Sequence, residues 1–221
     1  MPNPKKDFLG TKDIPLKDQY YRLNEMIIRD QLDQAGRELD HLFENTTYRD
    51  HPAYQGLAIS LLFHKNKYQD VIALGAVLFE AHPYLKEVGF CLATAYLRQR
   101  FYDKAIHVAE TCFQHNDRSN KLPQILFFAH LEKEKRLRIE ANGNPGMMKA
   151  AETHHRQAIE AGIKAVDNFR VHGGYRGVMA PEQRENFKNG RFFGQFKELY
   201  PQAETLLFFS MPFASSTSPE R

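Results

Sequence analysis

A repeat with a period of 34 residues is the feature that most constrains the fold of this chain. Residues 67–83, KYQDVIALGAVLFEAHP, are followed one period later by residues 101–117, FYDKAIHVAETCFQHND. Each stretch begins with a Tyr (Tyr68 or Tyr102) and an acidic residue, and continues into an apolar helical face. Together with the residues before it, each stretch reads as two amphipathic helices joined by a short polar turn. A fixed period of this length predicts stacked helix pairs.

This repeat resembles the tetratricopeptide repeat (TPR). In that family, small residues let the two helices of a pair approach, and large apolar residues fill the gaps between pairs. The copy at about 84–117 matches the pattern well. Its signature positions are Ala93, Ala95, Tyr96, Tyr102, Ala105 and Cys112, with Asp117 where Pro is usual.

The preceding copy, at about 50–83, fits mainly through its period and its apolar periodicity. It keeps Leu62, Tyr68 and Pro83. Large residues stand where the family prefers Gly or Ala, at Ile59, Val71 and Leu78. Nearby Gly75 and Ala76 could give back the space that these large side chains take.

Degenerate copies flank these two. Upstream, residues 20–43 form another helix pair. Downstream, residues 122–141 read as a first helix that runs past its usual length, and ANGNPG then breaks it. Residues 147–169 return as the second helix. Because Ala105 and Ala158 lie 53 residues apart, this copy carries 19 extra residues, which predicts an extended hairpin at about 133–155.

The resemblance implies an all-α fold, a right-handed TPR-like α-solenoid of antiparallel helix pairs with a C-terminal helical cap. We expect a flexible arm at 1–16, repeats at 17–169, a cap or extension at 170–213 and a disordered tail at 214–221. The aromatic-rich residues 181–213 have three possible roles. They could cap the end of the solenoid, lie in its groove as a self-inhibitory peptide, or dock onto a membrane or partner.

The composition and charge of the chain argue against a membrane-spanning, secreted or nucleic-acid-binding protein. No run of 18 apolar residues exists, and the start of the chain has no apolar signal-peptide core, so we expect a cytoplasmic protein without a transmembrane segment. The net charge is +3, and the largest basic cluster, KEKRLR at 133–138, is too mixed for nucleic-acid binding. Cys91 and Cys112 read as buried reduced thiols, with a disulfide as the alternative that the compartment disfavours.

No motif for catalysis, a cofactor or a metal is evident. The loop GGYRG at 173–177 reads as a turn rather than an anion site. His154 and His155 are adjacent on a helix and face different ways. His64, His107 and His130 belong to different repeats, and we interpret them as ordinary helix or surface histidines.

The family binds peptides or helices on a concave face lined by the first helix of each repeat. Transferring its groove positions to this chain gives Tyr20, Asn24, Ile27, Phe63, His64, Phe90, Thr94, Leu97, Arg98, Gln124, Phe128 and Leu131. Some members hold a chaperone's terminal carboxylate with a Lys and Asn clamp. Those positions are Gly56, Ser60, Phe90 and Thr94 here, so that co-chaperone function is not expected. An aromatic groove instead indicates helix-in-groove binding.

Three hypotheses follow. The first is a non-catalytic adaptor, scaffold or chaperone that binds a protein or peptide partner of unknown identity. The second is a structural subunit that assembles or self-associates through its repeats. The third, ranked lower, is an enzyme with an unrecognised site. A concave groove lined by Phe63, Phe90 and Phe128 would favour the first, and a flat apolar convex face the second.

Overall fold

The computed structural model describes residues 17–115, 121–172 and 181–207, and all regular structure in these ranges is helical. The all-α prediction is therefore confirmed for the described part of the chain. The expected N-terminal arm, the GGYRG loop and the expected polar tail lie outside the described residues.

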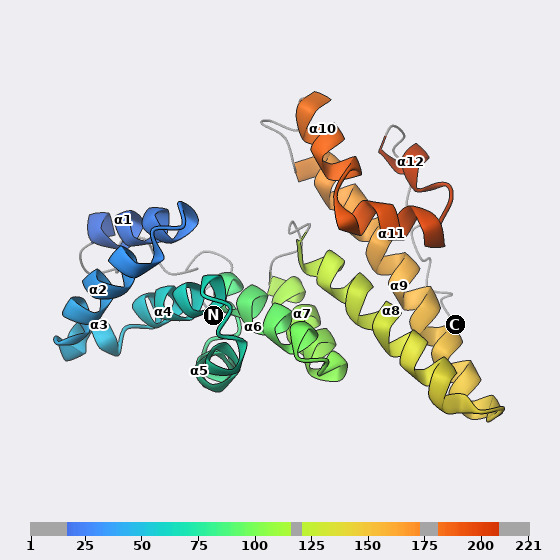
Figure 1. The fold of residues 1–221 in the computed structure, drawn as a ribbon, viewed down its shortest axis with the longest axis horizontal. Coiled ribbons are helices and arrows are strands. Elements are labelled where there is room, and N and C mark those ends of the chain that lie inside the picture. Colours follow the sequence, from blue (N-terminus) through green and yellow to red (C-terminus); the bar gives the residue numbers. More distant parts are fainter. Residues whose placement is uncertain (1–16, 116–120, 173–180, 208–221) are drawn as a thin grey trace, which may run out of the picture.

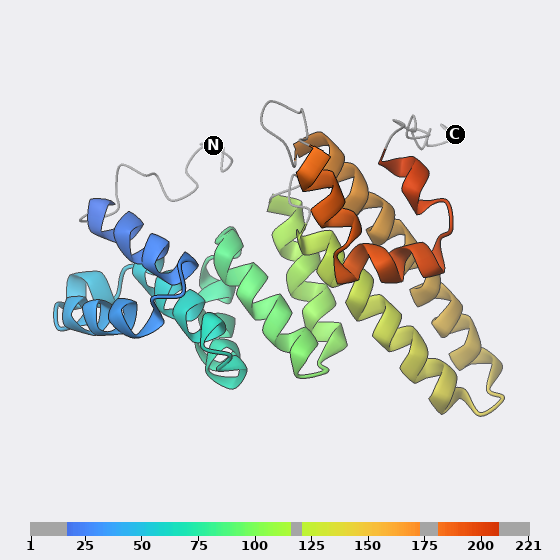
Figure 2. The same cartoon turned by 45° about the horizontal axis from the view of Figure 1, so that its top comes forward.

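The helices follow one another with short connections. Residues 17–172 contain α1 (Lys17–Ile28), α2 (Leu32–Phe43), α3 (Thr46–Arg49), α4 (Pro52–His64), α5 (Tyr68–Ala81), α6 (Lys86–Arg98), α7 (Tyr102–His115), α8 (Lys121–Ala141) and α9 (Pro145–His172). The C-terminal segment contains α10 (Pro181–Lys188), α11 (Arg191–Leu199) and α12 (Ala203–Leu206). Figures 1 and 2 show α1 to α9 arrayed in chain order, with α10–α12 beside α8 and α9.

The same tight turn recurs between α1 and α2, between α4 and α5, and between α6 and α7. Its central residues, Asp30, Asn66 and Arg100, have left-handed φ values of 62°, 57° and 64°. In each turn this residue donates its N–H to the carbonyl three residues back, and the next N–H reaches the carbonyl five residues back. These paired bonds satisfy the last carbonyls of the preceding helix, as in a Schellman motif. Asn and Asp tolerate this backbone well, whereas Arg does so less readily.

Buried apolar side chains form three clusters along the chain, one in α1–α4, one in α4–α8 and one in α8, α9, α11 and α12. Helices α4 and α8 contribute to two clusters each, so the core continues through the stack. The large residues of the 50–83 copy are buried in the middle cluster. A Cβ at Gly75 would lie 3.5 Å from Leu92 Cδ1 and 3.9 Å from Ile59 Cγ2, which are ordinary van der Waals distances, so the packing here does not require glycine.

Helices α8 and α9 form the extended hairpin. They have 21 and 28 residues, against 12 to 14 for α1, α2 and α4–α7. The αL turn seen after the shorter first helices is absent at the corresponding place in α8, which continues to Ala141. The chain reverses at Asn142 and Gly143, with φ values of 38° and 85°. The Asn144 side chain then accepts a hydrogen bond from the Gly146 N–H, 2.9 Å away, at the start of α9.

The C-terminal segment packs its aromatic side chains onto this hairpin. Phe192, Phe193 and Phe196 of α11 are buried in the third cluster. The rings of Phe192 and Phe196 lie 5.3 and 5.8 Å from that of Phe127, which has no exposed surface. Gly162 of α9 makes the approach possible, because a Cβ there would come within 2.4 Å of the Phe196 ring.

Replacing Gly162 with Ala should loosen α11 and α12. The added methyl would overlap the buried Phe196 ring, and overpacking of this kind costs about 1–3 kcal/mol. We expect faster amide hydrogen exchange across residues 191–207, while α4–α7 keep their protection. Gly194→Ala is the matched control, because no atom lies within 4 Å of its added methyl and Ala favours the helix. Unchanged exchange in Gly162→Ala would contradict this packing.

Candidate interaction surface

An aromatic pair joins the predicted groove residues of α4 and α6. The rings of Phe63 and Phe90 lie 5.9 Å apart at 64°, an edge-to-face arrangement. Both side chains are half-buried, and Phe63 also contacts Tyr68. The protein thus covers each side chain in part and leaves some of its surface exposed.

The other predicted residues of these two helices surround the pair. His64 is exposed, with its ring 5.8 Å from that of Phe63. Leu97 is half-buried and Arg98 is exposed at the end of α6. Thr94 donates its hydroxyl hydrogen to the Phe90 carbonyl, 2.8 Å away, so that hydroxyl is engaged within its own helix. We call Phe63, His64, Phe90, Thr94, Leu97 and Arg98 the α4–α6 surface.

A cation that the groove positions did not include also belongs to this surface. The Lys121 ammonium at the start of α8 lies 5.2 Å from the centre of the Phe90 ring. Such a cation–π contact orients the ring and places a positive charge beside it. Nothing in the local sequence signals this contact, because it depends on how α8 stacks on α6.

The predicted groove residues of α8 are largely covered. Leu131 is buried in the third cluster, so it belongs to the core and offers no surface to a partner. Phe128 is half-buried, and its ring contacts Phe192 at 6.2 Å, with Arg191 above it at 5.8 Å. Gln124, one turn earlier, remains half-buried. The C-terminal segment therefore packs against α8 and covers part of the surface expected for a partner.

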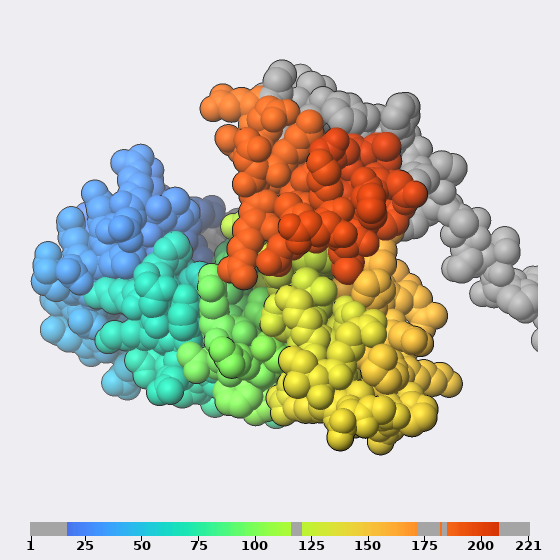
Figure 3. All heavy atoms as spheres, turned by 45° about the vertical axis from the view of Figure 1, so that its right-hand side comes forward, coloured from blue at the N-terminus to red at the C-terminus, as the bar shows by residue number. Residues whose placement is uncertain are grey.

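The three predicted groove residues of α1, at the N-terminal end of the described chain, differ in their exposure. Ile27 is 1% exposed in the first cluster, so it too belongs to the core rather than to a groove. Tyr20 is half-buried against Tyr54, and Asn24 is half-buried beside it on α1. Burial raises the pKa of Tyr20, and the charge of the Glu87 carboxylate raises it further. Figure 3 shows the surface hollowed between α1, blue, and the C-terminal segment, orange to red.

The hairpin contains a buried polar network that the sequence did not reveal. His130 of α8 and His154 of α9 stack, with their Nδ1 atoms 2.9 Å apart, so one ring donates and the other accepts. His155 meets Glu134 at 3.1 Å, and Arg138 donates to the same carboxylate at 2.8 Å. His154 and His155 thus face different partners, as adjacent helical residues must. The described residues include no cluster of three or more groups that could hold a metal.

This network should make the protein sensitive to acid. Burial, and then the neighbouring His154, lower the pKa of His130 from 6.5 to about 4. Between these values the unfolded chain binds a proton that the folded protein excludes, so the free energy of unfolding falls as pH drops from about 6.5 to about 4. The loss is at most about 3 kcal/mol.

Urea unfolding between pH 7 and pH 4 measures this effect. His130→Gln keeps a polar partner for His154 but cannot titrate, so its stability should fall less steeply with pH. His107→Gln, at an exposed histidine of α7, is the control. Equal slopes for wild type and His130→Gln would contradict the role of His130.

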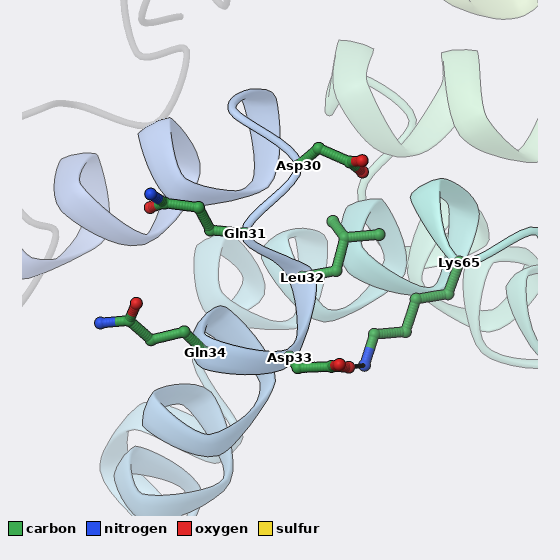
Figure 4. A pocket seen from close by; sticks show the side chains of 6 residues that line it. All are labelled: Asp30, Gln31, Leu32, Asp33, Gln34 and Lys65. Carbon is green, nitrogen blue, oxygen red and sulfur yellow. Dashed lines mark hydrogen bonds and ion pairs between the residues drawn. The ribbon is translucent and has the colours of Figure 1, made fainter.

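Two further places bring polar or thiol groups together or bury them. The hollow beside the α1–α2 turn has a volume of about 550 Å³, but Figure 4 shows Gln31 and Gln34 pointing away from Lys65. Asp33 and Lys65 pair at 2.9 Å, and this bond lowers the pKa of Asp33. Cys91 and Cys112 are free and buried, and burial raises their thiol pKa values to about 12 and about 11. Neither place therefore offers a reactive group.

Comparison with protein-family models, with characterised proteins and with solved structures gives no match to this chain. Across the described ranges, no helix combines the length and the apolar character needed to cross a bilayer. A function for this protein therefore has to be argued from its own surfaces.

Proposed function

We propose that this protein is a TPR-like α-solenoid that binds a peptide or helix of a partner protein, as an adaptor, scaffold or chaperone without catalytic activity. The repeat is supported by three αL turns with the same hydrogen bonds, centred 36 and 34 residues apart. Stacked helix pairs with a fixed period form extended binding surfaces on their inner face.

The observation that carries the proposal is the Phe63–Phe90 pair on the α4–α6 surface. Two aromatic side chains from successive first helices meet in a half-buried position, and Leu97 lies two turns further along α6. Because both rings are already half-buried, covering their exposed remainder with a partner contributes less than the roughly 1.5–3 kcal/mol of burying a whole aromatic side chain. Aromatic anchors of this kind usually carry much of the binding energy of an interface.

The chemistry of the α4–α6 surface suits an amphipathic helix. The apolar face of a bound helix would lie on Phe63 and Phe90, and its polar face would remain near Arg98 and Lys121. This is the helix-in-groove mode, in which residues one turn apart anchor the ligand.

Affinity capture with variants tests the proposal. Phe90→Glu introduces a charge at the centre of the α4–α6 surface and should abolish capture of a partner that wild type retains. Leu74→Glu is the matched control, because Leu74 is 54% exposed on α5, away from that surface. Circular dichroism should show both variants folded. A partner that survives Phe90→Glu but is lost from Leu74→Glu would overturn the groove assignment.

The second candidate, a structural or self-associating subunit, is favoured by α5. Leu74 and Val77 are 54% and 71% exposed, and exposed Ala73 and Ala81 extend their face. An apolar helix face of this kind can mark an assembly contact.

Sedimentation velocity separates this candidate from the first. If the protein acts as an adaptor, wild type and Val77→Glu should sediment alike as monomers at micromolar concentration. A wild-type oligomer that Val77→Glu dissociates would instead favour assembly through α5. Ile139→Glu, at an 82% exposed apolar position of α8, adds the same single negative charge elsewhere and is the control.

An enzyme remains the lowest-ranked candidate. An enzyme would need reactive groups that converge on one site. The histidines and the carboxylate of the α8–α9 hairpin instead interact with one another. We propose that the protein works in the cytoplasm and without a cofactor.

A further inference from the structure

A cleft lies where the extended α8 passes the α6–α7 turn, at the place in the repeat where the α1–α2 turn and Lys65 form the other hollow. In a regular copy the first helix ends in an αL turn, but α8 continues past that point and stands beside the α6–α7 turn. The cleft has a volume of about 400 Å³, within the range of ligand sites. Its lining residues are Arg100, Phe101, Tyr102, Asp103, Lys104, Lys133, Arg136, Leu137 and Glu140.

Positive charge exceeds negative charge in this cleft, with four cations against two carboxylates. Lys133 pairs with Asp103, and Arg136 donates through Nε to Glu140 at 2.7 Å. Lys104 lies over the Phe101 ring at 5.7 Å. The exposed Arg100 guanidinium makes no ion pair or hydrogen bond with any described residue. One strong donor group is therefore available at the rim.

An apolar wall lies beside these cations. Phe101 is 52% exposed although it is a large aromatic residue, and Leu137 faces it from α8. A ligand that fits must bring a negative group for Arg100 and an apolar group for Phe101. The two carboxylates in the cleft oppose a densely charged polyanion, because each would face phosphate groups at close range.

We propose that this cleft binds an extended peptide segment in which an acidic residue neighbours a large apolar residue. The peptide carboxylate accepts hydrogen bonds from the Arg100 guanidinium, a geometry that favours two parallel bonds. The adjacent apolar side chain packs on Phe101 and Leu137. The site lies outside the α4–α6 aromatic pair, so a partner can be held at two separate places.

Arg100 can be tested without endangering the fold. Asn66 occupies the same αL position one repeat earlier, so Arg100→Asn removes the guanidinium and supplies a residue that suits the turn. Thermal unfolding should show this variant at least as stable as wild type. Arg37→Gln, on the exposed face of α2, removes one charge elsewhere and is the matched control.

Fluorescence anisotropy gives the readout, with a short fluorescein-labelled peptide in which Glu alternates with Phe, and its Gln counterpart. Wild type and Arg37→Gln should bind the Glu peptide about tenfold more tightly than the Gln peptide, since one charge-assisted hydrogen bond is worth about that factor. Arg100→Asn should lose this preference, and Phe90→Glu should keep it. The proposal would be overturned if wild type bound both peptides equally, or if Arg37→Gln lost the preference for the Glu peptide as fully as Arg100→Asn does. Displacement of the Glu peptide by millimolar inorganic phosphate would also overturn it.

Discussion

The reversal of the chain at fixed left-handed turns is the constraint on which this structure depends. At Asp30, Asn66 and Arg100 the backbone ends one helix and starts the next within a few residues, with the same two hydrogen bonds each time. Because the turns are alike, successive helices meet at similar places and bury similar faces. The aromatic residues of α4 and α6 become neighbours for this reason, although they are far apart in the chain.

Where the turn is missing, the structure departs from the repeat in several linked ways. Helix α8 runs on against α9, and the two helices bury the side chains of His130 and Glu134 near the middle of α8. The same hairpin offers Phe127 and the bare backbone of Gly162 to the C-terminal segment. Its outer side forms the cleft beside Arg100. The α8–α9 hairpin thus contains a polar core, a docking place for the C-terminal segment and one wall of the cleft.

Sequence periodicity predicted the helices and the hairpin because both depend on local patterns. The polar break at ANGNPG and the apolar spacing of residues 122–141 place the long helices correctly. Placing individual side chains required the stacking itself. Ile27 and Leu131 fall in the core because neighbouring helices cover them, and Phe128 meets α11 from a distant segment. The contacts of Lys121 and of His130 with His154 likewise arise only in three dimensions.

Site-specific photocrosslinking tests the central claim most directly, namely that the α4–α6 surface holds a partner. Phe90→p-benzoylphenylalanine and Val77→p-benzoylphenylalanine would be irradiated in cells of the source organism, and adducts identified by mass spectrometry. We expect a discrete protein adduct from position 90 that position 77 does not give. Adducts from position 77 alone, or the same adducts from both positions, would contradict binding at this surface.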